Sequence, residues 1–218
     1  MMATLTSTPL TAKSGTADSL VIFLHGYGAD GADLLGLGEV LAPHMPNTEF
    51  HAPNAPERCV NNPMGYQWFP IPWMDGSTEA QMTASFTASV AALDAYLDDI
   101  ASRTGIGPER TVLVGFSQGT MMSLHVGPRR ADPLAGIVGF SGRLLAPEDI
   151  GSVISKPPVL LIHGDVDPVV PFAHMAEAAT ALRGAGFDVD THTSHGTPHG
   201  IAPDGLSKAL LFLHEHLA

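Results

Sequence analysis

The stretch of sequence that decides the fold is Gly115-Phe116-Ser117-Gln118-Gly119. It follows an apolar run at residues 111–114 and precedes residues 120–126, a helical pattern that ends at a Gly-Pro pair. A serine between a buried strand and a helix, with a glycine two residues away on each side, is typical of a nucleophile elbow. The glycines let the strand and the helix approach closely, and the sharp turn lifts the serine hydroxyl out of the sheet. The motif alone is common, so its position between these two elements carries the interpretation.

Short apolar runs alternate with amphipathic stretches along the rest of the chain. The runs are residues 20–24, 49–52, 111–115, 134–140, 159–163 and 187–192. Several are apolar on both faces, which is typical of parallel strands covered by helices on both sides. Apolar residues at helical spacing mark helices at 86–100 and 206–217. The sequence therefore predicts one α/β domain over residues 1–218, with a mostly parallel twisted sheet and residues 1–18 as an edge strand or a flexible segment.

Composition excludes several classes of protein. The chain has 218 residues, with 10 basic against 22 acidic side chains and a formal charge of −12, which argues against a nucleic-acid partner. Folding at this length buries about 70% of the chain surface, so a full hydrophobic core is available. Cys59 is the single cysteine, which excludes an internal disulfide and cysteine-rich zinc sites. We see no signal peptide and no membrane-spanning run, and we therefore expect a cytoplasmic protein without stable membrane insertion.

A serine hydroxyl needs a base that takes its proton, and the base needs an acid that orients it. Downstream of such an elbow, the acid comes first and the histidine follows. Asp165 and Asp167 both follow the run at 159–163. Asp165 stands beside the turn glycine, where aspartate commonly bonds its own backbone. We favour Asp167 as the acid; the alternatives are Asp165, or a turn in which neither is catalytic.

The base is expected between the last predicted strand and the C-terminal helix. His192, His195 and His199 all lie there, among 11 histidines in the chain. His192 belongs to the end of the strand and His195 precedes a glycine turn. His199 stands last, on the loop ahead of the helix. We favour His199 as the base and keep His195 as the alternative.

Backbone amides are expected to bind the negative charge that develops on the carbonyl oxygen of a substrate. The N–H of Gln118 begins the helix after the serine, where the helix dipole favours negative charge. The run at 20–24 leads into a tight glycine turn, His25-Gly26-Tyr27-Gly28. The N–H of Tyr27 is the predicted second donor, and His25 is interpreted as a structural residue of the turn.

Residues 53–77 are predicted to form a long loop that interrupts the alternation of strands and helices. The loop has five prolines and both tryptophans, and its aromatic content argues against disorder. These side chains either cap the core or form the wall of a substrate pocket, and we favour the second interpretation. The predicted pocket residues are Met64, Trp68 and Phe69 from the loop, with Met121 and Val169 from elsewhere.

With these residues located, the chain resembles the phospholipase/carboxylesterase family of α/β-hydrolases, which includes the acyl-protein thioesterases. The resemblance covers residues 20–216 and rests on four collinear motifs. They are Phe23-Leu24-His25-Gly26-Tyr27-Gly28, Gly115-Phe116-Ser117-Gln118-Gly119, His163-Gly164-Asp165-Val166-Asp167-Pro168-Val169-Val170-Pro171 and Pro198-His199-Gly200. It implies Ser117, Asp167 and His199 as a catalytic triad and the N–H groups of Tyr27 and Gln118 as the oxyanion hole.

Other segments refine the resemblance. The segment at 67–71 is similar to a Trp-Phe pocket motif of the family, and the glycine turn at 27–31 looks like that of the bacterial branch. Two departures concern the substrate: Met121 and Met122 stand where small residues are frequent, and Pro70 replaces an acidic residue of the thioesterase branch. The segment between the runs at 134–140 and 159–163 is too short for a lid domain.

These observations predict a serine carboxylesterase that acts on short- to medium-chain acyl esters and takes a small-molecule ester as its substrate. The alternatives are an acyl-protein thioesterase or lysophospholipase, and a non-catalytic hydrolase-fold binding protein. No cofactor or metal is expected, because the chemistry requires neither and Glu-x-x-His spacing is absent. The resemblance allows a homodimer.

Overall fold

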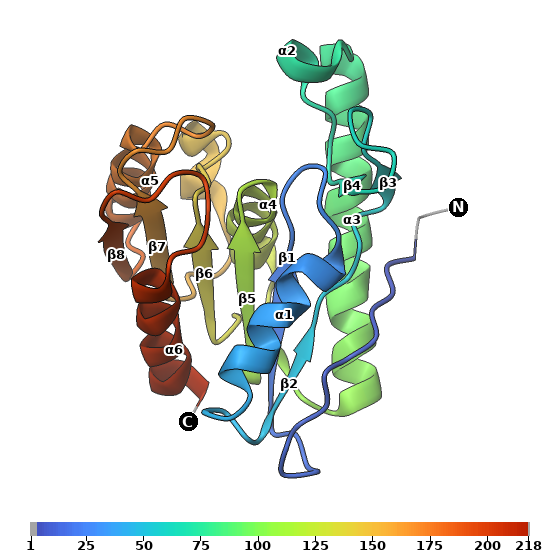
Figure 1. The fold of residues 1–218 in the computed structure, drawn as a ribbon, viewed down its shortest axis with the longest axis vertical. Helices are drawn as coiled ribbons and strands as arrows, with labels where there is room; N and C mark the ends of the chain where they lie inside the picture. The colour runs from blue at the N-terminus through green and yellow to red at the C-terminus, as the bar shows by residue number, and fades with distance from the viewer. Residues whose placement is uncertain (1–3, 218) are drawn as a thin grey trace.

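A parallel sheet of six strands forms the centre of the computed structural model, which describes residues 4–217 (Figure 1). The strands are β1 (Ser19–Leu24), β2 (Thr48–His51), β5 (Thr111–Phe116), β6 (Gly136–Phe140), β7 (Val159–Gly164) and β8 (Val189–Ser194). Each predicted run overlaps one of them, and all their pairings are parallel. In the order β2-β1-β5-β6-β7-β8, β2 lies on one side of β1 and the later strands lie on the other side, so the strand order switches between β1 and β5. Ligands of open α/β sheets bind outside the carboxyl ends of the strands at such a point.

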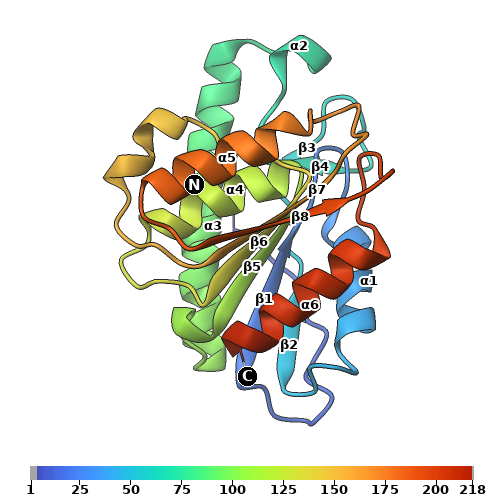
Figure 2. The same cartoon turned by 90° about the vertical axis from the view of Figure 1, so that its left-hand side faces the viewer.

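Helices cover both faces of this sheet, as predicted (Figure 2). One face packs against α1 (Gly31–Leu41) and α6 (Pro203–Leu217), and the other packs against α3 (Glu79–Thr104), α4 (Gln118–Val126) and α5 (Ala173–Gly184). The helices predicted at 86–100, 120–126 and 206–217 are confirmed as parts of α3, α4 and α6. Alternate residues of β1 point to opposite faces, yet all six are buried, which explains the continuous apolar run.

The helix α3 is longer than its apolar stripe because its two ends carry capping signals. Thr78 and Gln81 form a reciprocal capping box at its start. Gly105, with φ of 72°, ends it in the left-handed conformation that favours glycine. The helix therefore extends beyond the carboxyl edge of the sheet, next to the segment that interrupts the alternation (Figure 1).

That segment, predicted as a long loop, contains short elements. The strands β3 (Glu57–Arg58) and β4 (Tyr66–Gln67) pair antiparallel, and one turn of helix, α2 (Pro72–Asp75), follows them. The remaining elements are the 3-10 helices η1 (Pro108–Arg110), η2 (Gly127–Arg129) and η3 (Pro147–Ser152). Only η3 lies between β6 and β7, in agreement with the expected lack of a lid domain.

The N-terminal segment runs along the edge of the sheet next to β2. Leu10 makes an isolated antiparallel bridge with Phe50, so the predicted edge pairing is limited to one bridge. Ser7 Oγ is hydrogen-bonded to His51 Nδ1 at 3.0 Å and to Tyr96 Oη at 2.5 Å, which ties the segment to β2 and α3. Residues 1–3 of the predicted edge strand lie outside the described residues. Within residues 4–217, every helix is too short or too polar to cross a bilayer.

The close approach of α4 to β1 at Gly119 generates a prediction about stability. A methyl group on Gly119 would lie 1.8 Å from the carbonyl oxygen of Leu24 in β1, where backbone has to move. We expect Gly119→Ala to lower the free energy of unfolding by about 3 kcal/mol or more in urea denaturation.

Gly36 in α1 is the matched control, because an added Cβ meets nothing within 4 Å. Gly36→Ala should raise the free energy of unfolding by about 0.5–1 kcal/mol through helix propensity. Equal unfolding midpoints for the two variants would contradict the close approach of α4 to β1.

Candidate active site

Ser117 lies between the end of β5 and the start of α4 in a strained backbone conformation. Its φ of 54° and ψ of −113° are rare for a residue with a side chain. A hydrogen bond of 2.9 Å from its N–H to the carbonyl oxygen of Phe140 holds the turn against β6. A Cβ on Gly115 would lie 2.4 Å from the backbone nitrogen of Thr120, so only glycine permits this turn. The turn has the geometry expected of a nucleophile elbow.

Asp167 presents a buried carboxylate whose two oxygens both accept hydrogen bonds. Oδ1 accepts from the backbone N–H of Val169 at 2.8 Å and of Val170 at 2.9 Å. Oδ2 lies 2.7 Å from Nδ1 of His199. Burial by itself would raise the pKa of Asp167, but the hydrogen bonds from His199 and the two amides outweigh it and hold the pKa below its usual value. The carboxylate is therefore ionised at neutral pH.

His199 is oriented by this carboxylate. Because Nδ1 donates to Asp167, the neutral imidazole carries its free electron pair on Nε2. The ring packs against Phe116, the residue before Ser117, at a centroid distance of 4.9 Å. Among the described residues, no hydrogen bond joins Ser117 Oγ to His199. Such bonds are often long before substrate binds. The structure thus brings Asp167 into direct contact with His199 and places His199 against the neighbour of Ser117.

The alternative acid and base contact each other instead. His195 Nδ1 lies 2.8 Å from Asp165 Oδ2, and the side chain of His195 is 85% exposed. His192, within β8, is bonded to Asp204 at 2.8 Å. Each histidine of this segment therefore has its own carboxylate, and only the pair Asp167–His199 includes a carboxylate with no exposed surface.

The two amides predicted to form an oxyanion hole begin neighbouring segments. Gln118 is the first residue of α4, where backbone N–H groups have no partner within the helix. Tyr27 follows Gly26, where an added Cβ would lie 3.4 Å from Cβ of Ser117. The loop after β1 therefore lies directly against the elbow.

The side chain of Gln118 joins the elbow to the segment after β4. Its Oε1 accepts from the N–H of Trp68 at 3.1 Å, and its Nε2 donates to the carbonyl oxygen of Phe69 at 2.6 Å. Trp68 Nε1 in turn donates to the carbonyl oxygen of His25 at 3.0 Å. The elbow, the segment after β4 and the glycine turn after β1 thus form one buried hydrogen-bonded network. Sequence reasoning considered only the backbone of Gln118, since nothing in the pattern indicates a side-chain partner 50 residues away.

His25 is a structural residue, as interpreted from the sequence. The N–H of Ala55 donates to Nε2 at 2.9 Å, so the proton of the neutral ring is on Nδ1, which donates to the carbonyl oxygen of Gly26 at 2.8 Å. Burial lowers the pKa of His25, which keeps the ring neutral.

The hydroxyl of Tyr27 connects the same loop to α2. It donates to Asp75 Oδ2 at 2.9 Å, and that oxygen also accepts from the N–H of Ile71 at 2.7 Å. Burial and hydrogen bonds with Cys59 and Asp75 raise the pKa of Tyr27 far above its usual value, so the phenol remains a donor. The motif analysis missed Asp75 because its partner lies 48 residues away.

The predicted pocket residues lie in different surroundings. Trp68 has no exposed surface and belongs to the core, where its indole N–H donates to the carbonyl oxygen of His25. Met64 is 82% exposed and points away from the core on a turn next to β4. Phe69 and Met121 are nearly buried, and Val169 is half exposed beside Asp167. A wall formed by these three residues stays a prediction.

Comparisons with known proteins agree with this architecture. Residues 7–217 match the phospholipase/carboxylesterase family. The chain is similar to acyl-protein thioesterase 1 of Gibberella zeae, at 31% identity over 211 residues and 90% of both chains. It is 28% identical to esterase YpfH of Escherichia coli over 201 residues, covering 92% of this chain and 82% of that protein. The crystal structure of esterase PE8 superposes with a TM-score of 0.90 at 47% identity, covering 98% of this chain and 100% of the other.

The Gln118 network generates a second prediction. Gln118→Ala removes the partners of one N–H and one C=O, both buried, and should lower the free energy of unfolding by about 2–4 kcal/mol. Thermal unfolding measures the change. The exposed Gln81 serves as control, with Gln81→Ala costing about 1 kcal/mol through loss of the capping box. If Gln118→Ala lowers the free energy of unfolding no more than Gln81→Ala does, the network does not hold the segment after β4 in place.

Proposed function

The chain belongs to the phospholipase/carboxylesterase family, and from this premise we propose that it is a serine carboxylesterase that hydrolyses short- to medium-chain acyl esters. The coarser assignment, an α/β hydrolase of the esterase or thioesterase type, follows from the family and from its relatives. The observation that carries the finer proposal is the strained Ser117, whose neighbour Phe116 packs against a His199 ring bonded to a buried carboxylate. A hydroxyl and an oriented base in this arrangement serve nucleophilic catalysis.

In the proposed acylation, Ser117 Oγ attacks the carbonyl carbon of the ester while His199 Nε2 takes its proton. The carbonyl oxygen becomes an oxyanion that accepts hydrogen bonds from the N–H groups of Tyr27 and Gln118. The tetrahedral intermediate then expels the alcohol oxygen, which receives the proton from His199. Asp167 stabilises the imidazolium between these transfers and keeps the proton on Nδ1.

In the proposed deacylation, His199 takes a proton from water as the water oxygen attacks the acyl carbon. The second tetrahedral intermediate forms in the same oxyanion hole. Its collapse breaks the bond to Ser117 Oγ, which regains a proton from His199, and the carboxylic acid leaves. The cycle requires no group beyond these residues and water.

The preference for short acyl chains is supported by aromatic packing between α3 and α4. The ring of Phe86 packs edge-on against Phe69 at 5.4 Å and against His125 at 4.7 Å. Met121, one turn into α4, belongs to the same apolar cluster and is nearly buried. We propose that these packed side chains limit the length of the acyl chain that fits beside Ser117.

The second candidate function is that of an acyl-protein thioesterase. It is favoured by the name of the relative at 31% identity, acyl-protein thioesterase 1. The same residues perform thioester cleavage by the same steps, with a thiol in place of the alcohol as the leaving group. The acyl chain and the leaving group therefore decide between the two functions.

The proposed nucleophile predicts that Ser117→Ala abolishes both turnover of p-nitrophenyl acetate and labelling by a fluorophosphonate. The expected loss in kcat is about 10⁴-fold or more, because a serine of a triad has no substitute. Ser207→Ala, on the exposed side of α6, is the matched control and should keep full activity. Retained labelling of Ser117→Ala would refute the assignment, and a folded wild-type protein that never reacts would favour a non-catalytic binding protein.

The aromatic packing predicts a chain-length profile. With p-nitrophenyl esters from acetyl to palmitoyl, kcat/KM should be highest for the short chains. Phe86→Ala should move the optimum to longer chains, because it removes the ring between Phe69 and His125. Thioesters with matched acyl groups separate the two functions. A wild-type optimum at palmitoyl, or a thioester preference that persists at every length, would favour the acyl-protein thioesterase.

A further inference from the structure

His163 is a buried histidine directly beneath the carboxylate of Asp167. It is the last residue but one of β7, and its side chain is 1% exposed. Its Nε2 lies 2.9 Å from the carbonyl oxygen of Val170. Because a carbonyl oxygen only accepts, Nε2 carries the proton and donates it.

This hydrogen bond holds the turn that binds the carboxylate. Val170 uses its carbonyl oxygen for His163 and its N–H for Asp167 Oδ1. The same Nε2 lies 3.3 Å from Asp167 Oδ2, the oxygen that accepts from His199. The Nε2–H of His163 thus fixes the backbone of Val170, which donates to Asp167 Oδ1. The same N–H places a positive dipole beside Asp167 Oδ2.

The charge state of His163 matters for this arrangement. Burial lowers the pKa of His163, so the ring is neutral at pH 7 and donates without forming an ion pair that would neutralise Asp167. The titratable groups that face it are Asp167 and His199, and the ring of Phe172 at the start of α5 packs edge-on against it at 6.0 Å. The negative charge of Asp167 therefore remains available to the His199 imidazolium.

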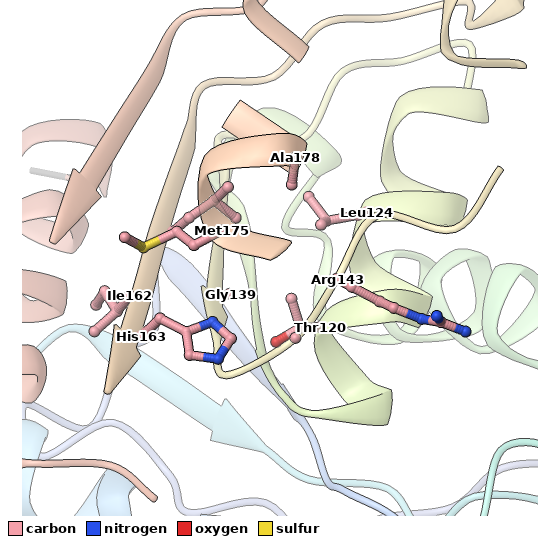
Figure 3. Close-up of a pocket in the computed structure, with 10 residues that line it drawn as sticks. Thr120, Leu124, Gly139, Arg143, Ile162, His163, Met175 and Ala178 are labelled. Carbon is pink, nitrogen blue, oxygen red and sulfur yellow. The ribbon is translucent and has the colours of Figure 1, made fainter. Parts of the chain in front are cut away.

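His163 also borders a small hollow between the sheet and the helices α4 and α5. Figure 3 shows His163 at its edge, across from Thr120, with Arg143, Leu124, Met175 and Ala178 also lining it. The ring is therefore not packed tightly on every side, and the hydrogen bond to Val170 sets its orientation.

We propose that His163 is a positioning residue that holds the Val169–Val170 turn and the Asp167 carboxylate in the orientation that His199 requires. The proposal rests on the proposed function, in which Asp167 orients the base. Misplacing that carboxylate by about 1 Å would lower kcat by about 10- to 100-fold, since the orientation of His199 would no longer be held. Binding of the ester would change little, because His163 is buried away from the substrate.

Three variants separate positioning from simple filling of space. His163→Gln supplies an amide N–H at the reach of Nε2, His163→Asn supplies one that falls short of Val170, and His163→Phe fills the volume without a donor. Steady-state kinetics on p-nitrophenyl acetate, thermal unfolding and the downfield proton resonance of the bond between His199 and Asp167 are measured for each. We expect His163→Gln to stay within a few-fold of wild type and His163→Asn and His163→Phe to lose kcat about 10- to 100-fold at unchanged KM, with the downfield resonance lost.

The outcomes are distinguishable. Equal kcat in all folded variants would overturn the role of His163 while leaving Ser117 as the nucleophile. An equal loss in His163→Gln and His163→Phe that follows their thermal stability would show that His163 is only structural. If His163→Phe does not fold, His163→Gln against His163→Asn provides the same comparison. Failure of the wild-type protein to react with a fluorophosphonate would overturn the proposed function, and this positioning role with it.

Discussion

The close approach of α4 to the sheet is the constraint on which the rest of the structure depends. At Gly119 a single methyl group would lie 1.8 Å from the carbonyl oxygen of Leu24, and at Gly115 it would lie 2.4 Å from the backbone nitrogen of Thr120 in the first turn of the helix. The chain can reverse from β5 into α4 within this space only if Ser117 adopts a positive φ, which costs about 1–3 kcal/mol. Burial of the helix against β1, β5 and β6 offsets that cost. The position of Ser117 at the tip of the turn between β5 and α4 is thus a consequence of helix packing.

A polar network inside the apolar core fixes the loops around this turn. Gln118, Trp68 and His25 satisfy one another's backbone and side-chain groups in a region without water-accessible surface. Buried polar groups are costly unless they are paired, so such a network admits few alternative arrangements. The network explains why Trp68, predicted as a pocket residue, belongs to the core. Its indole N–H is the only polar group of the side chain, and it holds the loop after β1 through the carbonyl oxygen of His25.

Burial also distinguishes three histidine–carboxylate pairs that look equivalent along the chain. The pairs of His192 and His195 lie at the surface, where solvent screens the interaction and the pairing contributes little. Asp167 is buried and accepts from two amides, so its charge acts on His199 at short range and in a less polar medium. Position in the structure, more than residue type, thus separates a pair suited to catalysis from two pairs that fasten loops.

Local patterns were sufficient for the six strands of the main sheet, for three of the main helices and for the elbow, because apolar periodicity and glycine spacing report on neighbours within a few residues. They also singled out Asp167 and His199, whose order along the chain follows from the parallel topology. The contacts of Gln118 with Trp68, of Tyr27 with Asp75 and of His163 with Val170 were decided only by the tertiary structure. Two of these join residues about 50 positions apart, and all depend on which polar atoms become buried together, a property that no local pattern encodes.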